Sequence, residues 1–357
     1  MATLKDVAAL AGVSTATVSL ALNGGPVNEK TRETVKKAAL QLNYFPNKIG
    51  RMLNSGRSNT IELVILTSAA VPNIVRRTSL FYYLMEGILA VADQHNLSMR
   101  FAVKSYDDDD VNAYFSELVG GRTVEGVVIL PQFAQATSFT QLLERARFPF
   151  VMLRPAAFGT DVSFVDMGNY EGARMVAELL VGCGARRLGI INGPATHVDA
   201  IERERGFTDT LLDAGAALVA KANGAYTIES GFEAMAQLAA KKTLPEAVFC
   251  ANDYMAAGAI KYLTGAGIRV PHDIAIVGYD NNDMATAIEP ELTTIDNRFY
   301  DLGHALATNL LALIREPRDR VQTVIPPRLV LRRSHAPVAP EEKKGAAAPR
   351  RSRSRAG

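Results

Sequence analysis

The 357-residue chain has little cysteine, no tryptophan and no long apolar run, and these absences narrow the class of protein. Its two cysteines, Cys183 and Cys250, are far apart and lie in apolar surroundings, so we expect buried thiols rather than a disulfide or a metal site. No apolar stretch reaches membrane-spanning length. The first residues, MATLKDVAAL, lack the basic start and apolar segment of a secretory signal, which predicts a cytoplasmic protein.

The motifs of common catalytic classes are also absent. The sequence contains no Walker loop, GxGxxG fingerprint, HExxH zinc motif or GxSxG nucleophile elbow. His197 lies near Asp199 and Glu202, but a loop histidine among acids is more often solvated than catalytic. The sequence therefore predicts no enzyme, no cofactor and no metal site.

The net charge of +2 is unevenly distributed along the chain. Residues 1–60 carry eight Lys or Arg against three acids, and residues 332–357 carry eight against two, which leaves −9 for the residues between them. An acidic body with a basic amino-terminal part suggests that this part meets a polyanion while the body does not. Charge alone also fits a membrane surface or RNA.

The first 46 residues predict three short helices. Thr3 and Asp6 have the spacing of a capping box, and Gly12 is expected to end the first helix. Ser14 is placed to cap a second helix at 15–22, and Asn28 to cap a third. Two short helices joined through glycine form a helix-turn-helix, whose second helix enters a major groove. The second helix and its flanks are rich in short polar side chains: Ser14, Thr15, Thr17, Ser19 and Asn23. With the basic charge, this pattern favours DNA binding over a purely structural bundle.

From residue 61 onward, apolar β-branched runs alternate with helical patterns. The expected strands are 61–66, 99–103, 126–130, 150–153, 188–191, 247–250 and 274–277, and the expected helices include 83–95, 170–183, 201–214, 230–240 and 255–265. This order predicts an α/β fold of parallel sheets covered by helices on both faces, long enough for two lobes. The tail from residue 336 has no apolar periodicity and is expected to be disordered.

The stretch TLKDVAALAGVSTATVSLALNGGPVNEKTRETVKKAALQLNYFPN closely resembles the headpiece of the LacI family of bacterial repressors. The motifs INGP, RERGF, CANDYMAAGAI, VGYDNN, PELTTI and LVLRRS follow in order, so the resemblance runs from residue 2 to about 335. It implies a homodimer that binds near-palindromic operator DNA, with a small-molecule effector held between two periplasmic-binding-protein-like lobes.

The resemblance also implies a division of the chain. A helix-turn-helix domain takes 1–46, a hinge helix 47–59, an effector-binding and dimerisation core 60–335, and a disordered basic tail 336–357. Within the core, lobe 1 takes about 60–160 and 295–325, and lobe 2 takes about 161–294 and 326–335.

By motif position, the resemblance assigns base contacts to Thr15, Ala16 and Leu20. Phosphate contacts suit the polar residues around them: Ser14, Thr17, Ser19 and Asn23. Leu20 stands where many relatives carry Arg, and a leucine offers only apolar contact, for example with a thymine methyl, where arginine can form a bidentate contact with guanine. We therefore predict a half-site different from those that Arg-bearing relatives read.

Residues 47–58 resemble the hinge helix that forms on operator binding. Leu53 takes the position of the leucine that relatives insert into the minor groove, where an apolar wedge kinks the duplex. Arg51, with Lys48 and Arg57, is placed to contact phosphates beside it. The alternative for Leu53 is an ordinary buried linker residue.

Four residues of the core match positions that contact effectors in relatives. Arg203, Asn252 and Asp280 supply hydrogen-bonding groups suited to sugar hydroxyls or a purine, and Tyr226 matches an aromatic position that packs on the ligand. A structural role is the alternative for each: Asp280 in capping a loop, and Arg203 in pairing with an acid between lobes.

Arg154 departs from the family pattern, because many relatives carry Asp there. Together with Arg203 it would place two cations in the cleft, which points to an anionic effector such as a sugar acid or a sugar phosphate. A salt bridge from Arg154 to Asp161 or Asp166 is the alternative.

These observations predict a cytoplasmic regulator, associated with the nucleoid when bound to its operator, that acts as a repressor under the control of a sugar or sugar derivative. A solute-binding protein serving sugar transport or sensing is the alternative that the core alone allows. The basic headpiece and the lack of an export signal oppose it.

Overall fold

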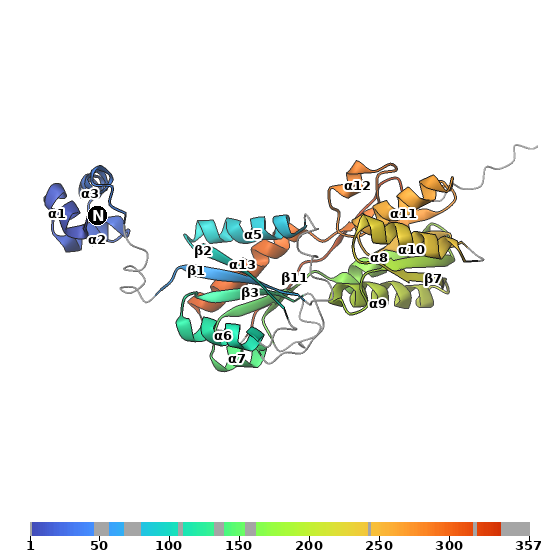
Figure 1. The fold of residues 1–357 in the computed structure, drawn as a ribbon, viewed down its shortest axis with the longest axis horizontal. Coiled ribbons are helices and arrows are strands. Elements are labelled where there is room, and N and C mark those ends of the chain that lie inside the picture. The colour runs from blue at the N-terminus through green and yellow to red at the C-terminus, as the bar shows by residue number, and fades with distance from the viewer. Residues whose placement is uncertain are drawn as a thin grey trace, which may run out of the picture. The chain divides into compact units, whose positions relative to one another are not determined.

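The computed structural model describes residues 2–45, 57–67, 80–105, 110–131, 139–153, 162–241, 244–316 and 320–336. The chain divides into two compact units, Met1–Asn59 with Arg122–Glu125, and Thr60–Gly121 with Gly126–Gly357 (Figure 1). The predicted disordered tail lies outside the described residues from 337 onward.

The amino-terminal unit contains the three predicted helices, α1 (Leu4–Ala11), α2 (Thr15–Leu22) and α3 (Glu29–Gln41). The capping box is confirmed, because Thr3 N–H donates to the Asp6 carboxylate at 2.7 Å while the Thr3 hydroxyl accepts from Asp6 N–H. Gly12 ends α1 with φ of 65°, in the left-handed region that glycine enters without strain. Asn28 caps α3 by accepting from Thr31 N–H at 2.7 Å.

One small apolar cluster holds the three helices together. Val7, Val18 and Val35 come one from each helix and are fully buried. α1 and α2 meet at 99°, within the usual range for a helix-turn-helix. No single helix in the described parts of the chain is long and apolar enough to cross a membrane.

The second unit contains two parallel sheets, one in each of two lobes. In lobe 1, the strand order is β11-β5-β4-β3-β1-β2. The strands are β1 (Thr60–Thr67), β2 (Ser98–Ser105), β3 (Gly126–Pro131), β4 (Phe150–Leu153), β5 (Phe164–Asp166) and β11 (Gln322–Val324). Figure 1 shows α5 (Leu80–Gln94) and α13 (Phe299–Arg315) on one face, with α6 (Asp110–Gly121) and α7 (Phe139–Arg145) on the other.

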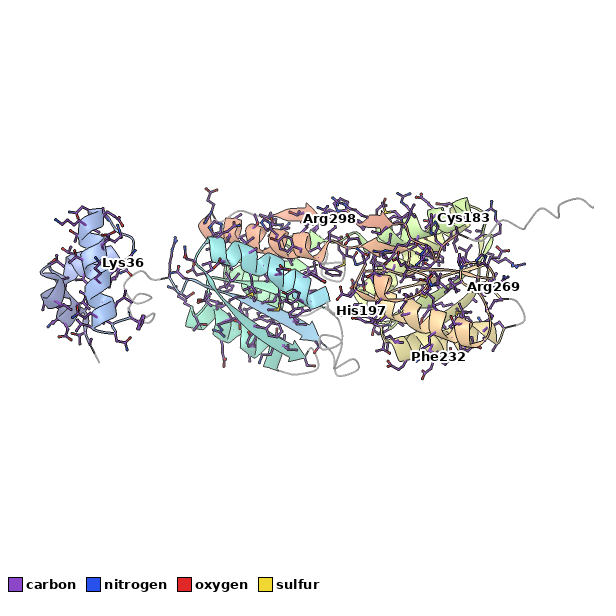
Figure 2. The ribbon with its side chains drawn as sticks, turned by 90° about the horizontal axis from the view of Figure 1, so that it is seen from above. Lys36, Cys183, His197, Phe232, Arg269 and Arg298 are labelled. Carbon is purple, nitrogen blue, oxygen red and sulfur yellow. The ribbon has the colours of Figure 1, made fainter. Side chains whose placement is uncertain are left out.

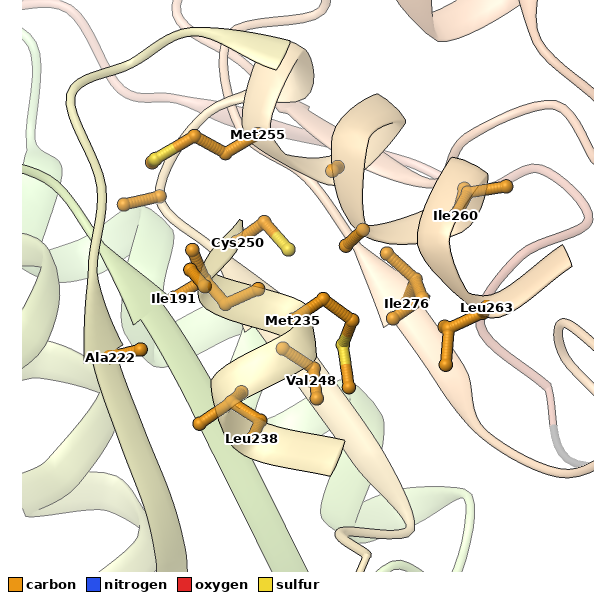
Figure 3. Packing of buried hydrophobic residues seen from close by; sticks show 14 of the residues in the cluster. Ile191, Ala222, Met235, Leu238, Val248, Cys250, Met255, Ile260, Leu263 and Ile276 are labelled. Carbon is orange, nitrogen blue, oxygen red and sulfur yellow. The ribbon is translucent and has the colours of Figure 1, made fainter. Parts of the chain in front are cut away.

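In lobe 2, the strand order is β7-β6-β8-β9, from β6 (Arg187–Asn192), β7 (Ala217–Asn223), β8 (Ala247–Cys250) and β9 (Ala275–Val277). Helices α8 (Asn169–Gly182) and α9 (Val198–Asp213) pack on one face. Helices α10 (Ile228–Ala239) and α11 (Asp253–Gly265) pack on the other, where Met235 and Leu263 lie over Val248 and Ile276 of the sheet (Figure 3). The short α12 (Met284–Ala287) follows β9.

The chain passes between the two sheets three times. β5 leads through Gly168 into α8, and β10 (Thr294–Asp296) leads through Asn297 into α13. β11 leads into β12 (Arg328–Val330), which pairs antiparallel with β10. The first passage falls a few residues later than the predicted boundary near 160, because β5 pairs with β4 in the lobe 1 sheet.

The two cysteines differ from the expectation of two buried thiols. Cys250 is fully buried at the end of β8, where burial raises its pKa far above the ordinary value. Cys183 is exposed, because it follows the last residue of α8, where the chain turns back toward the sheet. The prediction was therefore wrong for Cys183.

Candidate functional site

The exposed face of α2 carries the residues that the sequence assigns to base contacts. Thr15, Ala16 and Leu20 are exposed, while Val18 and Ala21 on the opposite face are buried in the headpiece core. Leu20 leaves 43% of its surface exposed although it is apolar. A single exposed leucine is common on protein surfaces, but Leu20 lies with Thr15 and Ala16 on the face of α2 that is not used by the headpiece core.

The hydroxyl groups around α2 bond to one another and to the helix backbone. The Ser14 hydroxyl accepts from Thr17 N–H at 3.0 Å and forms a hydrogen bond with the Thr17 hydroxyl at 2.9 Å. Asn23 donates from Nδ2 to the Ser19 hydroxyl at 3.3 Å. Thr17 and Ser19 are half-buried, whereas Ser14 and Asn23 are exposed. These bonds fix both ends of α2, and the exposed pair is better placed to meet phosphates.

Four lysines of the headpiece are exposed, Lys5, Lys30, Lys36 and Lys37, and Figure 2 marks Lys36 on α3. Their positive charge suits attraction to a nucleic acid backbone. Arg51, Leu53 and Lys48, predicted to lie in the hinge helix, fall outside the described residues.

The predicted effector residues of lobe 2 gather at one edge of its sheet. Arg203 lies on α9 after β6, Asn252 follows β8 and Asp280 follows β9, while Tyr226 lies between β7 and α10. The strand order reverses between β6 and β8, and ligands of open parallel sheets bind outside the carboxyl ends of strands at such a switch point. The fold therefore brings these four residues to the edge where a ligand is expected.

Arg203 is the centre of a buried hydrogen-bonded cluster. Its side chain is only 4% exposed, and Nη2 lies 3.2 Å from the Asp280 carboxylate. Nε donates to Asn169 Oδ1 at 2.6 Å and Nη1 donates to the Ala251 carbonyl at 2.5 Å. The guanidinium also lies 3.8 Å from the centre of the Tyr279 ring, a favourable cation–π distance.

Asp280 completes the cluster from the other side. Asn297 donates from Nδ2 to the same carboxylate oxygen at 3.0 Å. Burial raises the pKa of Asp280 to about 7, although Arg203 acts in the opposite direction. The expected alternative for Arg203, pairing with an acid, is confirmed, but the acid is Asp280 of lobe 2 itself and does not lie between the lobes.

Asn252 and Tyr226 support one another. Asn252 caps α11 by accepting from Met255 N–H at 2.8 Å and donates from Nδ2 to the Tyr226 carbonyl at 3.2 Å. The Tyr226 ring packs edge-on to His197 at 5.1 Å, with its hydroxyl 3.4 Å from His197 Nδ1. Both side chains therefore build the wall of the site, and any ligand contact comes in addition to that role.

The prediction that His197 is solvated was wrong, because the residue is only 4% exposed. It precedes α9 and packs on Tyr226, and Asp199 lies 3.8 Å from its Nδ1. Asp199 also accepts from Asn169 Nδ2 at 3.0 Å. The apolar ring of Tyr226, distant in sequence, covers the histidine, and no local pattern signals that contact.

The lobe 1 side of the predicted cleft lies outside the described residues. The segments that follow β1, β2, β3 and β4 are 68–79, 106–109, 132–138 and 154–161, and the last of them contains Arg154 and Asp161. Asp166, the other predicted partner of Arg154, accepts from Gly168 N–H at 2.9 Å. Within the described residues, no group of three or more His, Cys, Asp or Glu is arranged to hold a metal ion.

Residues 3–47 match the sequence pattern of a family described as bacterial regulatory proteins, lacI family, and residues 177–335 match a periplasmic binding protein-like domain. The HTH-type transcriptional repressor PurR of Mannheimia succiniciproducens is 32% identical over 346 residues, which cover 95% of this chain and 100% of PurR. The chain belongs to the lacI family of bacterial regulatory proteins. The HTH-type transcriptional regulator CelR of Thermobifida fusca is similar at 32% identity over 341 residues, which cover 93% of this chain and 98% of CelR.

Solved structures of this lacI family agree with the fold. A complex of the transcriptional regulator CelR with cellobiose is 30% identical, with a TM-score of 0.70 and coverage of 94% of this chain and 100% of CelR. A lac repressor dimer bound to operator and the anti-inducer ONPF is 28% identical, with a TM-score of 0.80 and coverage of 94% and 99%. The chain is therefore a cytoplasmic, DNA-binding transcriptional regulator with a two-lobed core, and neither an enzyme nor a solute carrier.

The cluster around Arg203 predicts that replacing this residue lowers the free energy of unfolding by an amount that depends on pH. In Arg203→Met, the Asp280 carboxylate stays buried without its cation, and we expect a loss of about 3–5 kcal/mol in the free energy of unfolding at pH 8. The loss should shrink toward pH 5, because an unpaired buried carboxyl binds a proton and the pKa of Asp280 is already raised to about 7 in the intact pair. Urea denaturation at both pH values measures the two losses.

Arg205→Met is the matched control, because Arg205 is on the same helix but its side chain is 58% exposed. We expect it to change stability by less than about 1 kcal/mol. If both variants lost the same free energy at pH 8, Arg203 and Asp280 would not form the pair described above.

Proposed function

We propose that the chain is a repressor that reads its operator with α2 and responds to a neutral, polyhydroxylated effector held at the carboxyl edge of lobe 2. The face of α2 that exposes Thr15, Ala16 and Leu20, away from the buried Val18 and Ala21, is the observation that carries the DNA-binding part. Thr15, Ala16 and Leu20 would face base edges, and Ser14, Thr17, Ser19 and Asn23 the phosphates. Binding to an operator would also place the protein on the nucleoid.

The hinge residues complete the proposed interface. Leu53 would enter the minor groove as a wedge, and Arg51 would meet the phosphates beside it, as the resemblance implies. A symmetric operator requires two headpieces, so the proposal includes a homodimer.

The neutral effector follows from the state of Arg203. Its guanidinium already bonds to Asp280, Asn169 and the Ala251 carbonyl, so one of the two cations predicted for the cleft is neutralised. Asp199 adds a carboxylate at the same edge, 24% exposed. An anionic ligand would therefore meet carboxyl groups and an arginine that is already paired, whereas sugar hydroxyls can donate to these carboxylates. Arg154 would then act as a hydrogen-bond donor to a hydroxyl.

Effector binding at this edge would act on the passages between the lobes. Asn169 is the first residue of α8 after the first passage, and Asn297 lies in the second, and both bond to the Arg203–Asp280 pair. A ligand that moves this pair changes the contacts of both passages and with them the relative orientation of the lobes. Such a change is the two-state element that coupling between effector and operator needs, and the coupling is reciprocal.

The exposed surface of α5 fits the second copy that a symmetric operator requires. Tyr82, Leu89 and Tyr300 are 67%, 45% and 42% exposed, and a groove of about 540 Å³ lies between them. Exposed apolar side chains gathered at one groove mark an association surface. A similar lac repressor has been solved as a dimer bound to operator. We propose that this surface of α5 and Tyr300 pairs with its counterpart on a second copy.

Exchanging Leu20 tests the DNA-binding proposal. In Leu20→Arg, the new guanidinium can form a bidentate contact, so we expect one position of each half-site to shift toward guanine. Selection from a random duplex library, followed by fluorescence anisotropy at two salt concentrations, measures this preference. Leu40→Arg adds the same charge at an exposed position on α3 and should strengthen binding to all duplexes without changing the preference. An unchanged preference in Leu20→Arg would refute the proposed docking of α2.

Calorimetry with matched sugars tests the effector class. We expect cellobiose or another neutral sugar of a panel to bind at least about tenfold more tightly than its sugar-acid or phosphorylated counterpart, equivalent to about 1.4 kcal/mol. Asp199→Asn should narrow this difference, because it replaces a carboxylate at this edge with a neutral amide. Tighter binding of the anionic member of a pair would reject the neutral effector. It would favour the alternative in which Arg154 and Arg203 together bind an anionic effector.

Sedimentation of a charged variant tests the dimer surface. Leu89→Asp places two carboxylates in the proposed interface, and we expect the dimer to weaken by about 2 kcal/mol or more, roughly thirtyfold in the dissociation constant. Leu212→Asp makes the same exchange at an 80% exposed leucine of lobe 2 and should leave the dimer intact. Dimers of equal strength in both variants would place the interface elsewhere.

A further inference from the structure

The carboxyl end of α2 closes with a left-handed glycine. Asn23 follows the helix with φ of −103°, and Gly24 after it has φ of 78°, in the left-handed region. The Ser19 carbonyl accepts from Asn23 N–H at 3.0 Å, and the Leu20 carbonyl accepts from Gly25 N–H at 2.8 Å. Neither of these two bonds uses the Ala21 carbonyl, which is among the last four carbonyls of the helix and takes a donor from outside it.

Arg32 of α3 supplies that donor. Its Nη1 donates to the Ala21 carbonyl at 2.8 Å and its Nη2 donates to the Gly25 carbonyl at 2.9 Å. Nε lies 3.4 Å from the Glu29 carboxylate, and the side chain is only 17% exposed. The planar fork of one guanidinium thus joins the end of α2 to the turn that follows it.

The same turn fixes the side chain of Leu20. A Cβ atom on Gly25 would lie 2.6 Å from Leu20 Cδ2 and 3.2 Å from Leu20 Cα. Gly25 therefore packs directly against Leu20, and Arg32 holds the carbonyl of that glycine. Leu20, which we propose to contact a base, is positioned by a chain of contacts that begins at Arg32.

We infer that Arg32 is a positioning residue for sequence recognition and not a phosphate contact. This inference rests on the proposed role of α2 and adds a residue to it. Leu20 reads a base only through close apolar contact, which weakens steeply with distance, so a small shift of the last turn removes it. A lysine keeps the charge but cannot bond both carbonyls in the fixed geometry of the guanidinium.

Three single variants of the full-length chain separate the two roles of Arg32. Arg32→Lys keeps the charge without the fork, Arg32→Gln removes both, and Lys36→Gln removes an equal charge from an exposed position on the same helix (Figure 2). The probes are the duplex that the wild-type chain enriches from a random library and a scrambled duplex of equal composition. Anisotropy titrations over a range of salt concentrations give both affinities and the salt slopes.

We expect Arg32→Lys and Arg32→Gln to weaken binding to the enriched duplex at least about tenfold, in keeping with two hydrogen bonds lost in each headpiece. Binding to the scrambled duplex should stay within about twofold, because attraction to phosphates is independent of sequence. The inference is overturned if Arg32→Lys binds both duplexes like the wild type. It is also overturned if Arg32→Gln lowers the salt slope by about 0.9 for each headpiece, the signature of a lost phosphate contact.

A double-mutant cycle with Leu20→Ala distinguishes positioning from general loss of folding. If Arg32 acts through Leu20, then Arg32→Lys adds little to the loss that Leu20→Ala already causes, whereas independent losses multiply. Gly25→Ala offers a second route, because its new Cβ displaces Leu20 while Arg32 stays intact, and we expect the same loss of preference. Multiplying losses, or a Gly25→Ala variant with wild-type preference, would contradict the inference.

Leu20→Ala alone tests the role on which the inference depends. If that variant keeps the wild-type preference, the proposed docking of α2 fails. If it loses preference while Arg32→Lys does not, only the inference about Arg32 fails.

Discussion

The buried pair of Arg203 and Asp280 is the contact on which the arrangement of the core depends most. A guanidinium and a carboxylate that are each about 95% removed from solvent are strongly destabilising unless each satisfies the other. The two charges pair with each other and also bond to Asn169, which begins α8 just after the first passage between the sheets, and to Asn297, which lies in the second passage. The electrostatic requirement of one residue in α9 therefore fixes backbone segments that set how the two lobes are joined.

Parallel sheet geometry explains why these residues meet. In each βαβ unit, the loop after the strand emerges at the carboxyl edge, so residues far apart in sequence collect there. His197, Tyr226, Asn252 and Asp280 come from four different loops of lobe 2. Tyr226 bonds to His197 and Asn252, and Asp280 bonds to Arg203, so these contacts are in place before any ligand arrives, which limits the conformational entropy that binding must overcome.

Much of the fold could be predicted from periodicity, and the failures have physical reasons. The strands at 126–130 and 247–250 are continuous apolar runs, and both were predicted because strands covered on two faces need such runs. β7 was missed, because it is an edge strand in which most residues are exposed or only partly buried. β5 was missed because its three residues are too short for a periodic signal. The helix α13 was also missed, although its buried leucines follow helical spacing.

The residues of the candidate sites could be named from the sequence, but their burial and their hydrogen-bond and ion-pair partners could not. The motif around residue 203 led to a buried arginine, yet only the structure shows that Asp280 neutralises it. That pairing spans 77 residues and depends on the distance between two loops, which no local pattern encodes. The prediction for His197 was wrong for the same reason, since the ring that buries this residue comes from Tyr226 on another loop.

The composition of α2 explains why its exact placement matters. Of the three residues proposed to face bases, Ala16 and Leu20 can offer only apolar contact and Thr15 a hydroxyl, while the exposed lysines would supply attraction that is the same for every sequence. A charged hydrogen bond tolerates a small displacement because its energy falls slowly with distance, but dispersion contacts lose much of theirs within 1 Å. A headpiece that reads DNA with leucine therefore depends more on the contacts that hold its helix, such as those of Arg32 and Gly25, than one that reads with arginine.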